Sequence, residues 1–219
     1  PYAIYYRPAG GGDRMEAMKL VSRDDGVTYA DVRGSRIAFA STDAIYTSQD
    51  SGKTYKKITS LKAGEQVTSL KLSTDGTSIA YGLLPDVGSK NTVKTVSVDG
   101  KAEDDLFTSD KPGVFIYAWN KSLKQIFYQE GCYNCDGSVP GDMLRDLTTN
   151  KVTNPLTKSA ESILTGQPVI SDDFSTIVYQ LGKTTAAGRT LDLGILGFPP
   201  YTINVFTVAD SKTAAVATI

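Results

Sequence analysis

The feature that most constrains the fold is a pattern that recurs four times along the chain. Each copy contains a strand-like segment, a polar turn and a second strand-like segment that opens on isoleucine. The copies are YADVRGSRIAFAS (29–41), LKLSTDGTSIAYGL (70–83), YAWNKSLKQIFYQ (117–129) and PVISDDFSTIVYQ (168–180). Their anchor residues, Ile37, Ile79, Ile126 and Ile177, are separated by 42, 47 and 51 residues. A period of this length indicates stacked supersecondary units.

A second pair of strand-like segments follows each anchor. These pairs are AIYTSQDSGKTYKKIT (44–59), VKTVSVDGKAEDDLF (93–107), DMLRDLTTNKVTNPLT (142–157) and TINVFTVADSKTAAVATI (202–219). Each unit therefore has four antiparallel strands, which predicts the blades of an all-β propeller rather than a sandwich. The expected blades span approximately residues 29–60, 66–108, 114–158 and 163–219.

The second unit carries the most specific family signal. Its S-x-D-G-x-x-I-A-Y pattern, with Ser73, Asp75, Gly76 and Ile79, resembles the WD40-like PD40 repeat of TolB and of the propellers in prolyl oligopeptidase relatives. The similarity extends over about residues 29–219, and the other three units depart from it at the turn. The resemblance implies a propeller fold and says little about activity.

The opening segment predicts a partial blade over residues 1–28. YAIYYRP and EAMKLVSRDDG resemble the second and third strands of a blade without its first strand. Four blades and a partial one fit either a small closed ring, such as a five-bladed one, or part of a larger ring. Because the chain starts at Pro1 rather than Met, we expect a processed protein or a fragment.

Residues 48–55 resemble an Asp box, the turn found in sialidases and in many non-catalytic propellers. The pattern consists of Ser48, Asp50, Gly52, Thr54 and Tyr55. It lies between the third and fourth strands of the first unit, where Ser48 and Asp50 can hydrogen-bond the turn backbone. An active sialidase would also need a three-arginine clamp, a Tyr nucleophile with a Glu, and an Asp acid/base. The seven arginines of the chain lack that context, so we interpret the turn as structural.

Composition excludes several classes of function. The chain has 23 Lys and Arg against 24 Asp and Glu, so we expect neither nucleic acid nor an anionic membrane as a partner, and no apolar run is long enough for membrane insertion. It contains no His, which removes His-dependent triads and the commonest zinc ligand. No G-x-S-x-G nucleophile elbow occurs. We therefore expect a non-catalytic protein without a cofactor or metal.

Loop lengths predict the binding side. The long connections fall between the second and third strands of their units, at Leu83–Asn91, Glu130–Asp142 and Leu181–Tyr201, and so share one face of the ring. Insertions gathered on one face of a repeat array commonly mark the binding side, and we expect a protein or peptide partner there. The alternatives are passive loops, or a third loop that plugs the ring. The candidate contact residues are Tyr133, Arg189, Phe198 and Tyr201.

Two function classes thus remain open. The first is a binding or scaffolding module, which we favour, able to associate with the remainder of a larger chain or assembly. The second is a glycan-active, sialidase-like enzyme, or the gating propeller of a hydrolase whose catalytic domain lies outside this chain. A Ser/Asp/His domain in adjoining sequence, or turnover of a reporter substrate, would favour the second class.

The only cysteines, Cys132 and Cys135, lie in the Gly-rich loop EGCYNCDGSVPG. A redox C-x-x-C site needs a βαβ setting, and zinc needs two further ligands that this chain does not supply. We expect a local disulfide, which suits an oxidising, extracytoplasmic compartment such as the periplasm or cell surface. The alternative is a pair of reduced thiols in the cytoplasm.

Overall fold

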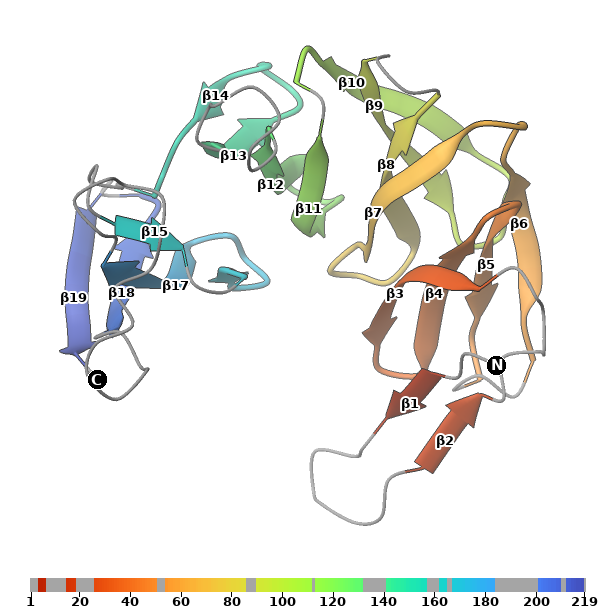
Figure 1. The fold of residues 1–219 in the computed structure, drawn as a ribbon, viewed down its shortest axis with the longest axis horizontal. Helices are drawn as coiled ribbons and strands as arrows, with labels where there is room; N and C mark the ends of the chain where they lie inside the picture. Colours follow the sequence, from red (N-terminus) through yellow and green to blue (C-terminus); the bar gives the residue numbers. More distant parts are fainter. Residues whose placement is uncertain are drawn as a thin grey trace.

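The computed structural model describes residues 4–6, 15–18, 26–50, 54–85, 90–111, 113–131, 141–156, 162–164, 167–183, 201–209 and 212–218. All regular structure in these ranges is β-strand. Within them no helix is long and apolar enough to cross a membrane. Four antiparallel sheets follow one another around an arc in chain order (Figure 1).

The first three sheets are four-stranded meanders in which each strand pairs with the next along the chain. The first sheet contains β3 (Val27–Arg33), β4 (Arg36–Ser41), β5 (Ala44–Ser48) and β6 (Lys56–Ser60). The second contains β7 (Gln66–Leu72), β8 (Ser78–Leu84), β9 (Asn91–Ser97) and β10 (Glu103–Ser109). The third contains β11 (Val114–Asn120), β12 (Gln125–Glu130), β13 (Gly141–Asp146) and β14 (Val152–Thr153).

The fourth sheet has five strands where the repeat predicts four. Two short strands replace a single first strand and pair with different parts of β17. Pro168 directly precedes the second of them, and proline has no N–H to donate to a strand ladder. The strands are β15 (Ser162–Leu164), β16 (Val169–Ile170), β17 (Thr176–Lys183), β18 (Tyr201–Thr207) and β19 (Lys212–Thr218).

A separate two-stranded sheet precedes the first sheet. It consists of β1 (Ile4–Tyr6) and β2 (Met15–Met18), which pair antiparallel. These strands lie within the segment predicted to form a partial blade, and Figure 1 shows them beside the first sheet.

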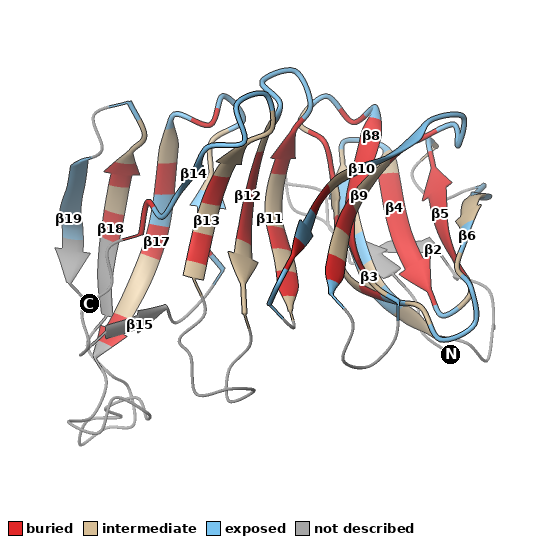
Figure 2. Ribbon diagram, turned by 90° about the horizontal axis from the view of Figure 1, so that it is seen from above, coloured by how far each residue is buried: buried red, intermediate tan, exposed pale blue. Residues whose placement is uncertain are grey.

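Apolar side chains fill the spaces between successive sheets. The four anchors lie on β4, β8, β12 and β17 and are at most 2% exposed, which confirms that they occupy equivalent, buried positions. One cluster joins the first and second sheets, a second joins the second and third, and a third joins the third and fourth. Figure 2 shows buried residues along the strands and exposed residues at the connections.

Hydrogen bonds between the innermost strands fix how the sheets stack. Between the second and third sheets, Ser69 Oγ donates to the carbonyl of Val114 at 3.2 Å and accepts from the N–H of Ile116 at 3.1 Å. Between the third and fourth sheets, Asn120 Nδ2 donates to the carbonyl of Asp172 at 2.7 Å. Because Ser69, Val114 and Ile116 are buried, breaking either bond of Ser69 leaves a buried polar group unsatisfied.

Candidate functional site

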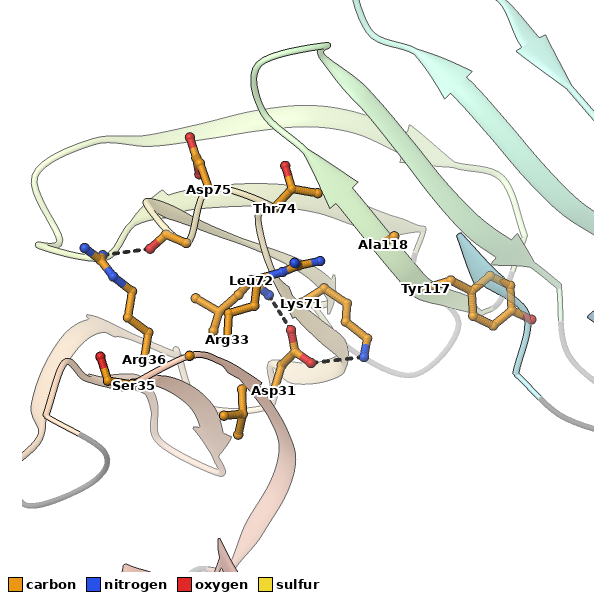
Figure 3. A pocket seen from close by; sticks show the side chains of 13 residues that line it. Asp31, Arg33, Ser35, Arg36, Lys71, Leu72, Thr74, Asp75, Tyr117 and Ala118 are labelled. Carbon is orange, nitrogen blue, oxygen red and sulfur yellow. Dashed lines mark hydrogen bonds and ion pairs between the residues drawn. The ribbon is translucent and has the colours of Figure 1, made fainter. Parts of the chain in front are cut away.

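Residues of the first three sheets line an open cavity of about 630 Å³. It opens beside the β3–β4 and β7–β8 turns, and β11 forms the opposite wall (Figure 3). Its lining residues are Asp31, Val32, Arg33, Gly34, Ser35, Arg36, Lys71, Leu72, Thr74, Asp75, Gly76, Tyr117 and Ala118. We call it the central cavity.

An ion pair between β3 and β7 is part of the lining of the central cavity. Asp31 Oδ1 lies 3.2 Å from Lys71 Nζ, and Asp31 Oδ2 accepts a hydrogen bond from the N–H of Leu72 at 2.9 Å (Figure 3). The two charged side chains are only 19% and 25% exposed, so water and salt screen them less than a surface pair. The carboxylate therefore both joins the two sheets and holds the ammonium group in place.

A second contact joins the two turns at the cavity mouth. Arg36 Nη1 donates to the carbonyl of Gly76 at 2.7 Å. Gly76 has a φ of +66°, and a Cβ there would lie 3.1 Å from Arg36 Cδ, so glycine suits both the turn and the packing. This contact fixes the guanidinium at the edge of the cavity.

The neighbouring carboxylate, Asp75, is held in its charged form. Partial burial alone would raise the pKa of Asp75, but hydrogen bonds from Ser73 and Thr77 outweigh it and lower the pKa. Ser73 Oγ donates to Asp75 Oδ1 at 2.5 Å, and the N–H of Thr77 donates to the same oxygen at 2.9 Å. A fixed negative charge thus stands beside the mouth.

Arg33 extends the site to the fourth sheet. Its Nη1 lies 2.9 Å from Asp172 Oδ1, in the turn between β16 and β17. The backbone carbonyl of Asp172 also accepts from Asn120 of the third sheet. Side chains of the first, third and fourth sheets therefore meet at the same turn, although the first and fourth are far apart in the chain.

The cavity is thus lined by three cations and two carboxylates, together with small polar residues and the apolar residues Val32, Leu72 and Ala118. Such a surface recognises a ligand through several directed hydrogen bonds. Each charged side chain of the lining also has a contact within the protein. Among the residues that the structure describes, no three His, Cys, Asp or Glu side chains cluster closely enough to hold a metal ion.

The turn between β5 and β6 lies outside the cavity lining. Ser48 Oγ donates to Asp50 Oδ1 at 2.8 Å, and Thr54 donates to the two carboxylate oxygens through its N–H at 2.9 Å and its Oγ1 at 2.7 Å. The Tyr55 ring packs edge-on against Phe39 and Tyr46. These contacts stabilise the turn and the face of the first sheet. Gly52 lies outside the described residues.

Of the contact residues expected from loop lengths, Tyr201 lies among the described residues. Tyr133, Arg189 and Phe198 lie outside the described residues, as do Cys132 and Cys135. Tyr201 is the first residue of β18.

The PD40-like motif contains Asp75 and Gly76 but did not identify them as cavity residues, and the repeat register contains a signal for other lining residues. Asp31, Lys71 and Ala118 each pair with the residue that follows the anchor isoleucine of their unit. Asp31 and Lys71 are charged residues at two equivalent positions on the innermost strands, where apolar residues are expected, and such a departure from the repeat signals a functional surface.

Comparison with known proteins agrees with this architecture. No family model and no curated protein matches the chain. Among solved structures, an oligogalacturonate lyase in complex with manganese superposes with a TM-score of 0.61 at 8% identity, over 84% of this chain and 50% of that one. Putative TolB from Agrobacterium tumefaciens gives a TM-score of 0.52 at 15% identity, over 85% and 62%.

The decisive comparison is with the β-propeller domain of the Trilobed protease from Pyrococcus furiosus, which has a TM-score of 0.54 at 13% identity over 88% of this chain and 57% of that one. The fold is a β-propeller. The four sheets are its blades, and the predicted fold class is confirmed. The chain spans about half to three-fifths of these three structures, and at such identities the likeness concerns the fold alone.

Proposed function

We propose that this propeller is a non-catalytic binding or scaffolding module that holds a peptide segment of a protein partner in its central cavity. The observation that carries the proposal is the polar cavity of about 630 Å³ formed by three blades. Its volume is in the range of small-ligand sites, and peptide backbone groups match its hydrogen-bonding lining.

The charge balance of the cavity supports a peptide over a polyanion. Asp31 offsets Lys71, Asp172 offsets Arg33, and the whole chain carries a formal charge of -1. Recognition then depends on local pairing with individual ligand groups rather than on long-range attraction. Neither nucleic acid nor a membrane is proposed as a partner, and association with the remainder of a larger chain or assembly is compatible with the same surface.

The test uses peptides selected from a random linear library against the wild-type chain. Ser35 lies in the β3–β4 turn and lines the cavity. Ser35→Trp should therefore obstruct the cavity and lower the affinity for the selected peptides about tenfold or more. The matched control is Ser122→Trp in the equivalent β11–β12 turn, which should leave affinity nearly unchanged. Retained binding by Ser35→Trp would move the site elsewhere.

The face formed by the long loops is the competing location. Deletion of residues 188–198 removes most of its longest segment and should leave affinity for the selected peptides unchanged if the cavity is the site. Loss of binding in the deletion, with β-type circular dichroism and melting behaviour preserved and binding by Ser35→Trp retained, would assign the partner to that face and to Arg189 and Phe198.

A gating or catalytic role is the second candidate, because one similar structure is the propeller domain of a protease and another is a lyase. In that case the propeller would control access to a catalytic domain outside this chain, or would itself be glycan-active. The binding proposal, in contrast, predicts that the chain does not turn over sialoside, oligogalacturonate or peptide reporter substrates. Turnover abolished by substitution of a cavity residue would replace the binding proposal.

An extracytoplasmic location is part of the proposal and depends on Cys132 and Cys135. We expect native material to contain one local disulfide. Intact mass after alkylation without reductant should show no added groups, and two should appear after reduction. Two alkylatable thiols in unreduced native material would contradict both the disulfide and the location derived from it.

A further inference from the structure

A second cavity, separate from the central one, lies between the second and third blades. It has a volume of about 290 Å³ and no lining residue in common with the central cavity. It is lined by Ser78, Thr95, Ser97, Ala102, Asp104, Leu106, Trp119, Lys121, Lys124 and Leu147. We call it the interblade cleft.

The floor of the interblade cleft is apolar. Leu106, Trp119 and Leu147 belong to the apolar cluster that joins the second and third blades. The volume is near the lower end of small-molecule sites, which suits one ring or a short alkyl chain. Burial of such a group against these side chains is favourable because it removes apolar surface from water.

The rim of the cleft is cationic. Lys121 and Lys124 come from the β11–β12 turn, and neither ammonium group has a hydrogen bond or ion pair within the described part of the chain. Asp104 is the one carboxylate among the residues lining the cleft, and Asp75 lies close enough to interact with the charge of Lys121. The turn therefore offers two cations to an incoming anion.

The backbone that carries the two lysines is firmly held. Leu123 donates its N–H to Asn120 Oδ1 at 2.9 Å, and Lys124 donates its N–H to the carbonyl of Lys121 at 3.2 Å. Lys124 has a φ of +51°, and its carbonyl accepts from the N–H of Leu147 at 2.8 Å. The backbone positions from which the two lysine side chains extend are thus set by the fold.

A buried donor beside the floor is unsatisfied. Trp119 is 4% exposed, and its indole Nε1 has no hydrogen-bond partner among the described residues. A buried polar group without a partner is uncommon in folded proteins and carries a free-energy cost. A carboxylate oxygen of a bound ligand would remove that cost where it reaches Nε1.

We propose that the interblade cleft binds a small apolar carboxylate, with its ring or alkyl body on Leu106, Trp119 and Leu147 and its carboxylate between Lys121 and Lys124. The same chemistry is present in a free aryl or alkyl acid and in the C-terminal residue of a peptide that ends in an apolar side chain. The site is independent of the central cavity and of the function proposed for it.

The test uses the only tryptophan of the chain, which lines the cleft. Titration with 4-phenylbutyrate should change Trp119 emission and saturate. The isosteric 4-phenylbutyramide keeps the apolar body and removes the charge, so it should bind about tenfold or more weakly. Absence of a saturable change with the acid, or equal affinity for acid and amide, overturns the proposal.

Substitutions separate the site from general surface charge. The double variant Lys121→Gln/Lys124→Gln should lower affinity for 4-phenylbutyrate about tenfold. The matched control Lys111→Gln/Lys151→Gln removes the same charge outside the cleft and should bind as wild type. Equal losses in the two double variants would mean a non-specific charge effect and would contradict the site.

A final arm identifies the source of the carboxylate. The tripeptide acetyl-Ala-Ala-Phe with a free C-terminus is compared with 4-phenylbutyrate in the same titration. Tighter binding of the tripeptide assigns the cleft to a peptide C-terminus, and tighter binding of the free acid assigns it to a small metabolite. Loss of either signal in the Lys121/Lys124 double variant supports a site separate from the central cavity when Ser35→Trp retains binding. Binding by Ser35→Trp is measured by calorimetry, because that variant adds a second tryptophan.

Discussion

A short Ser-x-Asp turn recurs at the hairpins of this propeller. Ser Oγ donates to Asp Oδ1 at 2.8, 2.5, 2.6 and 2.6 Å, respectively, in the pairs Ser48/Asp50, Ser73/Asp75, Ser97/Asp99 and Ser171/Asp173. In each turn the carboxylate also accepts a backbone N–H from the residue two or four positions later. The Asp-box-like segment thus shares its hydrogen-bonding chemistry with the other hairpins, which fits a structural role.

These carboxylates predict a loss of stability in acid. The N–H of Thr54 is the largest of several contacts that lower the pKa of Asp50 to about 2, and the hydroxyl of Ser171 does the same for Asp173, also to about 2. Because the pKa is lower in the folded state, the stabilisation is complete above the unfolded pKa of about 4 and is lost as the pH falls toward 2. Urea midpoints should therefore drop between pH 5 and pH 2.5, and Asp50→Asn should show a smaller drop. Equal slopes in the two proteins would contradict this assignment.

Gly100 illustrates a backbone position that only glycine suits. It has a φ of +78°, and a Cβ there would lie 2.9 Å from the carbonyl oxygen of Ile58 in the neighbouring blade. Gly100→Ala should lower the free energy of unfolding by about 1–3 kcal/mol. Gly34→Ala is the control, since its φ is +56° and no atom lies within 4 Å of the added Cβ. Chemical denaturation should show a larger loss for Gly100→Ala, and equal losses would exclude the clash with Ile58.

At the scale of strands, the sequence predicted the elements whose side chains repeat. The anchors lie on β4, β8, β12 and β17 because a buried strand between two blades requires apolar side chains on both faces. The division of the first strand of the fourth blade into β15 and β16 was not predicted, since the strand pattern around Pro168 resembles that of the other units. Local propensity does not reveal which part of β17 each segment will pair with.

Truncation of an anchor tests how much the repeated core contributes. Ile79 is 0% exposed in the cluster between the first and second blades. Ile79→Ala should cost about 2–5 kcal/mol, the usual range for a buried aliphatic side chain. Leu123→Ala, at a side chain that is 47% exposed, should cost far less, about 0.5 kcal/mol or below. Urea unfolding of both variants measures the difference, and comparable losses would contradict the burial pattern.

At the scale of the whole molecule, the arc brings together residues that no local pattern connects. Arg33 and Asp172 are 139 positions apart in sequence number, yet their side chains form an ion pair at 2.9 Å. Asp31 and Lys71 meet because two innermost strands lie side by side around the axis. The sequence indicated which strands surround the axis, whereas the central cavity depends on the angle between blades, which is set by packing across every interface.

The most direct test of the central claim is hydrogen–deuterium exchange of the chain with and without a peptide selected against it. Binding in the central cavity should slow exchange in segments 31–36 and 71–76, which supply most of the cavity lining. Exchange in residues 132–140 and 184–200 should be unchanged. Slowed exchange confined to those two loop segments, with 31–36 and 71–76 unaffected, would contradict the account and place the partner on the long-loop face.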